Sequence, residues 1–228
     1  MCSRYFLDAD GNVIAYTFCV PLNERVRRRF NIAPTQEAPI VRVSPEGPRE
    51  MAMLRWGLVP SWSKDLGAGT KMINARGESV AEKPAFREAM ARRRCLVPAT
   101  GFFEWKAAPG RKQPFAITVP ERPLFAFAGL WETWRPRGGE AVETFTIVTT
   151  DANEAVAQIH DRMPVILPKE AEDAWLRADV AGAGALLKPY EGPVALRAVS
   201  RVVSSVKNDV PECLDDAPAE AQGQQQLF

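Results

Sequence analysis

Phe115-Ala116-Ile117-Thr118-Val119 and Leu124-Phe125-Ala126-Phe127-Ala128 are two short apolar runs bounded by proline and charged residues. Both are rich in aromatic or β-branched residues, which favour a pleated, half-buried strand. The same pattern recurs at residues 40–43, 53–56 and 145–148. These five runs predict a domain built mainly from short β-strands.

Helical patterns are fewer than strand patterns. Residues 82–94, 152–159 and 168–177 are the predicted helices, the last with Pro168 in its first turn. Strands and helices do not alternate regularly, so the pattern predicts an α+β fold with a curved, largely antiparallel, barrel-like sheet flanked by a few helices. We expect one domain over residues 1–214 and a loose tail over residues 215–228, which are rich in Ala, Gln, Asp and Glu.

Composition narrows the function classes. The 228 residues include 29 Lys and Arg against 28 Asp and Glu, a net charge of +1, whereas proteins that coat duplex DNA by charge alone are usually much more basic. No apolar stretch is long enough to span a membrane, and the N-terminus lacks the layout of a secretory signal, so we expect a cytoplasmic protein without a membrane partner. A monomer is the default expectation.

The metal-binding residue types are sparse. Four cysteines are far apart in the sequence, and His160 is the only histidine. A zinc site of ordinary ligand spacing is therefore not expected, and no cofactor is predicted. Free thiols in a reducing compartment are the simplest interpretation.

Cys2 is the first residue with distinctive chemistry. If Met1 is removed, Cys2 carries an α-amine and a thiol, both partly available as nucleophiles near neutral pH. Such an aminothiol condenses with an aldehyde to an imine, and its sulfur then closes a five-membered thiazolidine. The alternative is a small buried cysteine that only packs at the start of a strand.

Two further stretches combine aromatic, polar and charged residues. Trp56 and Trp62 flank a Gly/Pro turn, where exposed indoles would stack on unpaired bases, although both rings could equally fill the core. Asn74, Arg76 and Glu78 alternate, so an extended backbone would place an amide, a guanidinium and a carboxylate on one face. A solvated strand face is the competing interpretation.

Glu104 and His160 are candidate proton-transfer groups. Glu104 lies in the aromatic run 101–105, where desolvation would raise the pKa of its carboxyl group, unless the side chain faces solvent. His160 is the side chain type best matched to proton transfer near pH 7, although a lone histidine is more often structural.

Taken together and in this order, the motifs resemble those of the SOS-response-associated peptidase (SRAP) family of abasic-site-processing proteins. The matching segments are Met1-Cys2-Ser3-Arg4, Asn31-Ile32-Ala33-Pro34-Thr35, Trp56-Gly57-Leu58, Asn74-Ala75-Arg76-Gly77-Glu78, Cys95-Leu96-Val97-Pro98, Gly101-Phe102-Phe103-Glu104-Trp105, Phe127-Ala128-Gly129-Leu130-Trp131 and His160-Asp161-Arg162-Met163-Pro164. One departure is Ser3, where many members have glycine, and its side chain could change how closely DNA approaches Cys2.

The resemblance implies a protein that senses abasic sites in single-stranded DNA and crosslinks to them through Cys2 after loss of Met1. It assigns catalytic roles to four residues: Cys2 as nucleophile, Asn74 as hydrogen-bonding partner, and Glu104 and His160 as acid and base. It further implies weak lyase activity, reversal of the adduct and self-removal of Met1. The DNA-binding residues that follow from the resemblance and the aromatic motifs are Arg4, Asn31, Pro34, Trp56, Trp62, Arg76 and Arg162.

Two other functions are compatible with the same residues. One is a hydrolase whose N-terminal cysteine attacks an amide carbonyl, with the α-amine as base. The other is a non-enzymatic reader of unpaired or modified DNA that uses only the aromatic loop. An abasic oligonucleotide separates both from covalent crosslinking, because only crosslinking requires a denaturation-stable adduct that depends on Cys2.

Overall fold

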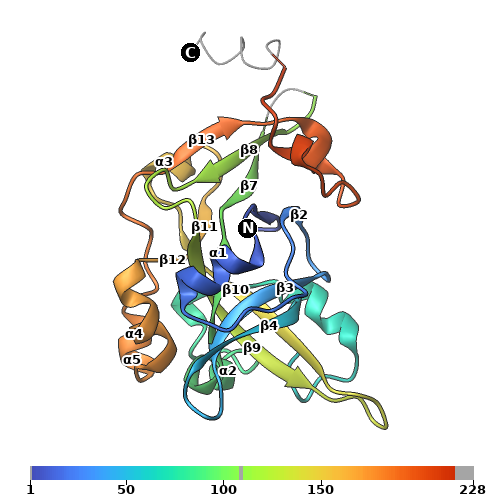
Figure 1. The fold of residues 1–228 in the computed structure, drawn as a ribbon, viewed down its shortest axis with the longest axis vertical. Helices are drawn as coiled ribbons and strands as arrows, with labels where there is room; N and C mark the ends of the chain where they lie inside the picture. Colours follow the sequence, from blue (N-terminus) through green and yellow to red (C-terminus); the bar gives the residue numbers. More distant parts are fainter. Residues whose placement is uncertain (1, 108–109, 219–228) are drawn as a thin grey trace.

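The computed structural model describes residues 2–107 and 110–218 and contains two β-sheets with short helices around them (Figure 1). The smaller sheet contains, in spatial order, β13 (Ala195–Ala198), β8 (Gln113–Thr118), β7 (Gly101–Lys106), β1 (Tyr5–Leu7) and β2 (Arg29–Ile32). The larger sheet contains β11 (Arg162–Pro164), β10 (Val142–Asp151), β4 (Arg49–Trp56), β3 (Glu37–Val43), β6 (Arg94–Ala99), β9 (Phe125–Trp134) and β12 (Ile166–Leu167), while β5 (Asn74–Arg76) pairs with β10.

The larger sheet closes on itself. Strands β10, β4, β3, β6 and β9 pair in that order, and β9 and β10 also pair with each other as an antiparallel hairpin. Strands β4 and β5 run parallel to β10, and the other pairings are antiparallel. A closed ring leaves fewer exposed strand edges than an open sheet. The predicted α+β fold with a curved, largely antiparallel, barrel-like sheet is confirmed.

Buried aromatic rings connect the start of the chain to the barrel. The Tyr5 ring of β1 lies edge-on to Trp56 of β4 at 5.3 Å and to Phe127 of β9 at 5.9 Å between centroids. All three side chains are fully buried, and burying an aromatic ring stabilises the fold by about 1.5–3 kcal/mol relative to exposure. These contacts hold the segment that follows Cys2 against the barrel.

Short helices surround the sheets. The α-helices are α1 (Gly11–Phe18), α2 (Arg87–Arg92), α3 (Glu154–Ala157), α4 (Glu172–Arg177) and α5 (Val180–Gly184). The 3-10 helices are η1 (Leu66–Lys71), η2 (Gly77–Ser79), η3 (Lys169–Ala171), η4 (Arg201–Ser204) and η5 (Pro211–Leu214). Helix α1 was not predicted, although Asp10 caps it by accepting hydrogen bonds from the Asn12 and Val13 backbone N–H groups.

The predicted helices are all longer than those in the structure. Helices α3 and α4 lie within the predicted ranges 152–159 and 168–177. The range predicted as 82–94 contains only α2, because Arg94 already pairs with Leu130 as the first residue of β6. Here the pairing of a buried strand overrides local helix propensity.

The predicted loose tail begins too early. The backbone N–H of Ser200 donates to the Asp215 carbonyl at 2.8 Å, and that of Ala217 donates to Ala198 at 3.1 Å. The side chain of Ala217 is buried. Residues 215–217 are therefore tied to the end of β13, and residues 219–228 of the predicted tail lie outside the described residues.

Candidate active site

Cys2 lies at the junction of the two sheets. Its side chain is fully buried, and the thiol lies 3.7 Å from the Arg4 carbonyl oxygen. The Asn74 side-chain amide, on β5 of the larger sheet, donates a hydrogen bond to the Cys2 carbonyl at 2.7 Å. The segment leading into β1 of the smaller sheet is therefore held against β5 at the residue predicted to be the nucleophile.

Trp56 supports this junction from inside the core. Its indole N–H donates to the Ile73 carbonyl at 2.8 Å, one residue before β5. The side chain is fully buried and stacks on Phe145 at 6.2 Å. The prediction of Trp56 as a stacking platform for bases is wrong, because no face of the ring reaches solvent. The adjoining Gly57 has φ +117°, and a Cβ there would lie 2.6 Å from the Gly69 carbonyl oxygen, so this turn requires glycine.

Glu104 lies on β7, and only 4% of its surface is exposed. Burial in this low-dielectric site raises the pKa of its carboxyl group to about 7. Burial and, secondarily, the nearby Glu104 carboxylate raise the pKa of the Cys2 thiol far above its ordinary value. Near neutral pH the thiol is protonated, whereas Glu104 is divided between its acid and base forms.

His160 follows α3, and its Nδ1 accepts a hydrogen bond from the Arg162 backbone N–H at 3.0 Å. The Asp161 carboxylate lies 2.8 Å from the same nitrogen. Burial lowers the pKa of His160, an effect that Asp161 partly opposes. Because its pKa lies below the ordinary value, the imidazole is mainly neutral at pH 7.

An open cleft of about 370 Å³ lies where these groups meet. Its lining consists of Ser3, Arg4, Glu104, Trp105, Lys112, His160 and Ser204. Four of these residues, Ser3, Trp105, Lys112 and Ser204, were not predicted as site residues. Trp105 belongs to the aromatic run already noted, whereas Lys112 and Ser204 stand in no recognised motif. The Ser3 side chain lies in the cleft next to Cys2, at the position where the sequence departs from the family pattern.

Arg4 is partly committed to the protein itself. Its Nη1 donates to Val203 O at 2.9 Å and to Asn31 Oδ1 at 3.1 Å, and its guanidinium lies 5.6 Å from the Trp105 ring centroid. Desolvation lowers its pKa from the usual value for arginine. A guanidinium has five N–H donors, so some remain for another partner, and the DNA-binding role of Arg4 stays a prediction.

Asn31 is a structural residue. It is fully buried, and its amide nitrogen donates to the carbonyls of Val203, Ser205 and Asn208 at 3.1, 2.9 and 2.7 Å. Asp209 closes the same junction by accepting hydrogen bonds from the Asn31 backbone N–H at 3.0 Å and from that of Phe30. The prediction of a side-chain DNA contact from Asn31 is wrong, because burial removes it from any ligand.

Arg162 is neutralised by two carboxylates. It forms a bidentate pair with Glu78 at 2.7 and 2.9 Å and a second pair with Asp151 at 2.6 Å. These hydrogen bonds, Glu78 first, raise the pKa of Arg162, and only 12% of its side chain is exposed. These pairs tie β11 to η2 and to the end of β10, and the predicted contact of Arg162 with DNA remains a prediction.

The other predicted DNA-binding residues lie at the surface. Trp62 is 66% exposed, and Arg76 is exposed at the end of β5. Pro34 is half-buried, and the residue after it, Thr35, has φ +73°, a backbone conformation rare for a β-branched residue. Their predicted contacts with DNA remain predictions.

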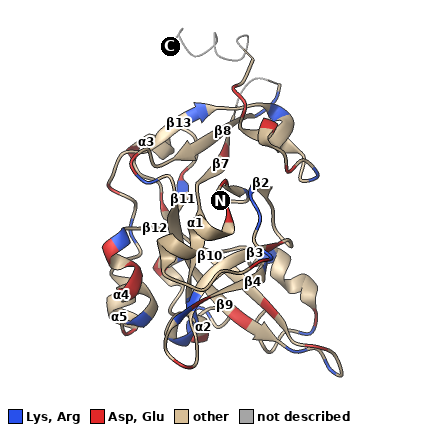
Figure 2. Cartoon of the chain, in the orientation of Figure 1, with Lys and Arg blue, Asp and Glu red and all other residues tan. Residues whose placement is uncertain are grey.

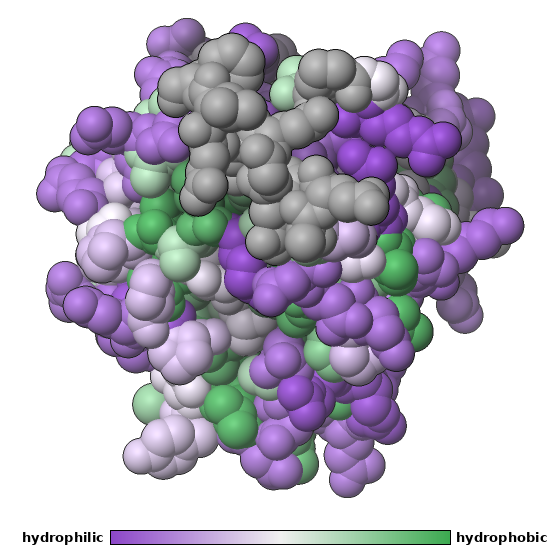
Figure 3. All heavy atoms as spheres, turned by 90° about the horizontal axis from the view of Figure 1, so that it is seen from above, coloured by the Kyte–Doolittle hydropathy of each residue, from purple (hydrophilic) through white to green (hydrophobic). Residues whose placement is uncertain are grey.

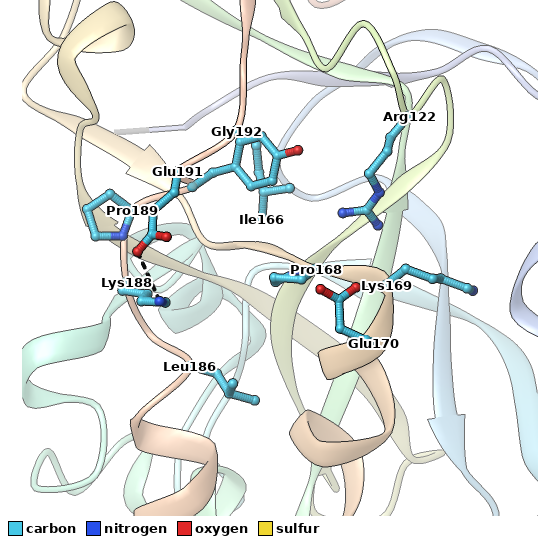
Figure 4. A pocket seen from close by; sticks show the side chains of 11 residues that line it. Arg122, Ile166, Pro168, Lys169, Glu170, Leu186, Lys188, Pro189, Glu191 and Gly192 are labelled. Carbon is cyan, nitrogen blue, oxygen red and sulfur yellow. Dashed lines mark hydrogen bonds and ion pairs between the residues drawn. The ribbon is translucent and has the colours of Figure 1, made fainter.

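A second cavity, of about 290 Å³, lies between β12, η3 and the loop after α5 (Figure 4). Its three cations are already paired: Lys188 with Glu191 at 3.0 Å, Lys169 with Glu172 at 3.0 Å, and Arg122 with the Leu167 carbonyl at 2.7 Å. Neither a histidine nor a cysteine is among the described residues that line it, so the cleft beside Cys2 is the stronger candidate site.

The figures show how charge is distributed along the chain and how hydropathy is distributed on one face. Basic and acidic residues are interspersed along the chain (Figure 2), in keeping with a net charge of +1. On the end of the molecule that carries β13, hydrophilic residues surround small scattered hydrophobic groups (Figure 3). Within residues 2–107 and 110–218, no helix is long and apolar enough to cross a membrane, and no three His, Cys, Asp or Glu side chains are grouped to hold a metal ion.

Comparison with known proteins matches residues 1–206 to the model of the family described as SOS response associated peptidase (SRAP). The abasic site processing protein YoqW of Bacillus subtilis is 40% identical, covering 94% of this chain and 99% of that protein. The abasic site processing protein HMCES of Gallus gallus is 34% identical, covering 83% of this chain and 66% of that protein. A crystal structure of a Bacteroides thetaiotaomicron protein matches with a TM-score of 0.86 at 28% identity, covering 95% of this chain and all of that one.

Proposed function

Because the chain belongs to the SOS response associated peptidase family, we propose that it processes abasic sites in single-stranded DNA by capturing them covalently through Cys2. The observation that carries this proposal is that Cys2, bound by Asn74, directly precedes two residues, Ser3 and Arg4, of the cleft that Glu104 and His160 also line. Asn74 binds the Cys2 carbonyl at 2.7 Å, while Glu104 and His160 line the adjoining cleft. The curated relatives named above as abasic site processing proteins support the same conclusion.

The first step prepares the nucleophile. While Met1 is attached, the Cys2 nitrogen belongs to an amide and cannot condense with an aldehyde. Hydrolysis of the Met1–Cys2 peptide bond consumes one water and releases methionine and the free α-amine. The Asn74 side-chain oxygen is buried and has no hydrogen-bond donor among the described residues. A free amine of Cys2 would supply that donor and be held with its lone pair available.

Capture then proceeds in two bond-forming steps. The amine adds to C1′ of the ring-opened deoxyribose aldehyde, and protonated Glu104 delivers its proton to the departing hydroxyl, which leaves as water. The resulting iminium carbon accepts the Cys2 sulfur, whose proton passes to the Glu104 carboxylate or to His160. The C=N electron pair returns to nitrogen, so an aldehyde and an aminothiol yield a thiazolidine and one water.

The burial of Glu104 sets the protonation states that these steps require. A carboxyl group with a pKa of about 7 exists in both forms at neutral pH, as a group that must first donate and then accept a proton requires. The iminium intermediate can also lose the 3′ phosphate by β-elimination, which gives the weak lyase activity. Ring closure removes the C=N bond and protects the strand, and protonation by Glu104 in the opposite direction reopens it.

A preference for single strands follows from access. Stacking on an exposed ring such as Trp62 requires an unpaired base, and a duplex hides both base faces. With a net charge of only +1 we expect modest non-covalent affinity, so capture depends on the covalent step.

The test uses an abasic single-stranded oligonucleotide and the purified chain. The parent protein should form a denaturation-stable adduct whose mass equals that of the Met1-free protein plus the oligonucleotide, less one water. Cys2→Ser keeps the amine but lacks sulfur, so it should give an imine that only borohydride traps. A stable adduct with Cys2→Ala, or a parent protein that retains Met1 in its adduct, would overturn the mechanism.

A further inference from the structure

Lys112 is the cation of the cleft that has no assigned role. It is exposed, lies directly before β8, and lines the cleft together with Glu104 and His160. None of the ion pairs among the described residues involves its ammonium group. The neighbouring cations differ, since Arg4 donates to Val203 and Asn31, and Arg162 is paired with Glu78.

The backbone of Lys112 is anchored although its side chain is free. The next residue, Gln113, is buried, and its amide nitrogen donates to the carbonyls of Pro114 and Val199 at 2.9 Å each. Gln113 also pairs with Lys106 in the β7–β8 ladder. A lysine on a fixed backbone can place a flexible point charge over the same cleft without a large entropic cost in the main chain.

The charge of Lys112 reaches the proton-transfer groups. Together with burial, it contributes to the low pKa of His160. A phosphodiester bound at Lys112 would therefore lie within electrostatic range of His160, on the side of the cleft formed by the smaller sheet. The sugar of an abasic site is flanked by two such phosphates, each separated from it by only a few bonds.

We propose that Lys112 binds a phosphate adjoining the abasic sugar and so positions the aldehyde carbon at Cys2. This inference rests on the proposed function, because it takes a single DNA strand as the ligand. It does not depend on whether a thiazolidine forms. A phosphate contact made by lysine reads no base, so its contribution is the same for every flanking sequence.

The experiment measures non-covalent binding of single-stranded DNA that carries a tetrahydrofuran abasic analogue, which has no aldehyde. Affinity is determined by fluorescence anisotropy over a series of salt concentrations. One phosphate contact to a single strand contributes about −0.7 to the slope of log K against log salt. Lys112→Gln should therefore reduce the steepness by about 0.7 and weaken binding equally for two different flanking sequences.

Two further variants serve as controls. Arg111→Gln removes the same charge from the adjacent exposed position, which does not line the cleft, and should leave the slope close to that of the parent. Lys112→Arg should retain the parent slope. An unchanged slope in Lys112→Gln, or an equal loss in Arg111→Gln, would overturn the proposal. Because the probe cannot crosslink, a failure of covalent capture by the parent protein with aldehyde DNA is detected separately.

Discussion

The Asn74 side-chain amide donates to the Cys2 carbonyl across 2.7 Å and thereby joins the two β-sheets at the proposed nucleophile. Asn74 is fixed by the parallel pairing of β5 with β10, in which it lies opposite Ile147. The position of Cys2 therefore depends on the closed barrel as well as on the N-terminal strand. A neutral hydrogen bond of this kind contributes about 0.5–1.5 kcal/mol to stability.

Asn74→Ala should slow covalent capture more than it destabilises the fold. Loss of the contact frees the Cys2 backbone and removes the acceptor for its amine, so we expect about a tenfold lower single-turnover rate, equivalent to about 1.4 kcal/mol. Denaturing gels follow the adduct with time, and thermal melting monitors folding. A rate equal to that of the parent in a folded variant would contradict the role of Asn74.

Glu104→Gln should remove the pH dependence of capture near pH 7. In the parent, a pKa of about 7 predicts that the rate of the step requiring the protonated carboxyl falls as pH rises above 7. Glutamine cannot titrate, so the variant should be slow and lack this inflection. A parent-like inflection in the variant would assign the titration to a group other than Glu104.

The same substitution should affect stability in a pH-dependent way. The folded pKa of Glu104 lies above its ordinary value of 4.5, so the folded state binds more protons and stability falls as pH rises from about 4.5 to 7. Well above pH 7 this penalty is fully present and is on the order of 3 kcal/mol. Glu104→Gln should consequently narrow the difference between urea unfolding at pH 5 and at pH 8.

Trp62 and Trp56 should respond differently to substitution. Trp62→Ala should weaken binding of single-stranded DNA by about 1–3 kcal/mol, the usual contribution of one stacked base, without changing the melting temperature. Trp56→Ala should lower the free energy of unfolding by about 3–5 kcal/mol, because its ring is fully buried. Anisotropy and calorimetry on both variants check the assignment, and a Trp62 variant that binds like the parent would exclude stacking there.

Thr35→Gly should stabilise the protein. The left-handed backbone at Thr35, with φ +73°, costs an L-residue about 1–2 kcal/mol, of which the larger entropy of unfolded glycine offsets about half. We expect a net gain of about 0.5–1 kcal/mol in urea unfolding. Thr35→Ala keeps a Cβ and is the matched control, which should show no such gain.

Short-range patterns predicted the strands and the position of the proposed chemistry. The apolar run 115–119 overlaps β8, and the aromatic context of Glu104 predicted a raised pKa, as burial produces. Contacts between residues far apart in the sequence could not be predicted from these patterns. Nothing near Asn31 or Trp56 in the sequence indicates that their polar atoms bind distant carbonyls, those of Val203 and Ile73.

The local sequence also does not show which basic residues are already paired within the fold. Arg162 is a predicted DNA-binding residue, and the local sequence does not show that its guanidinium pairs with Glu78, 84 positions away. Lys112 stands in no motif, and only the folded arrangement places it beside His160. Whether a charge is available to a ligand depends on partners that the fold, rather than the neighbouring sequence, supplies.

One side of the cleft includes Ser204, which is distant in the sequence from Arg4 and Asn31. Arg4 and Asn31 near the start of the chain bind the carbonyl of Val203, and Asp209 accepts from the backbone of Asn31. During synthesis on the ribosome, a nascent chain carries Cys2 long before residues 203–209 emerge. The segment around Cys2 thus meets its binding partner only after residues 203–209 have been synthesised, and a product terminated before them has the proposed nucleophile without a completed site.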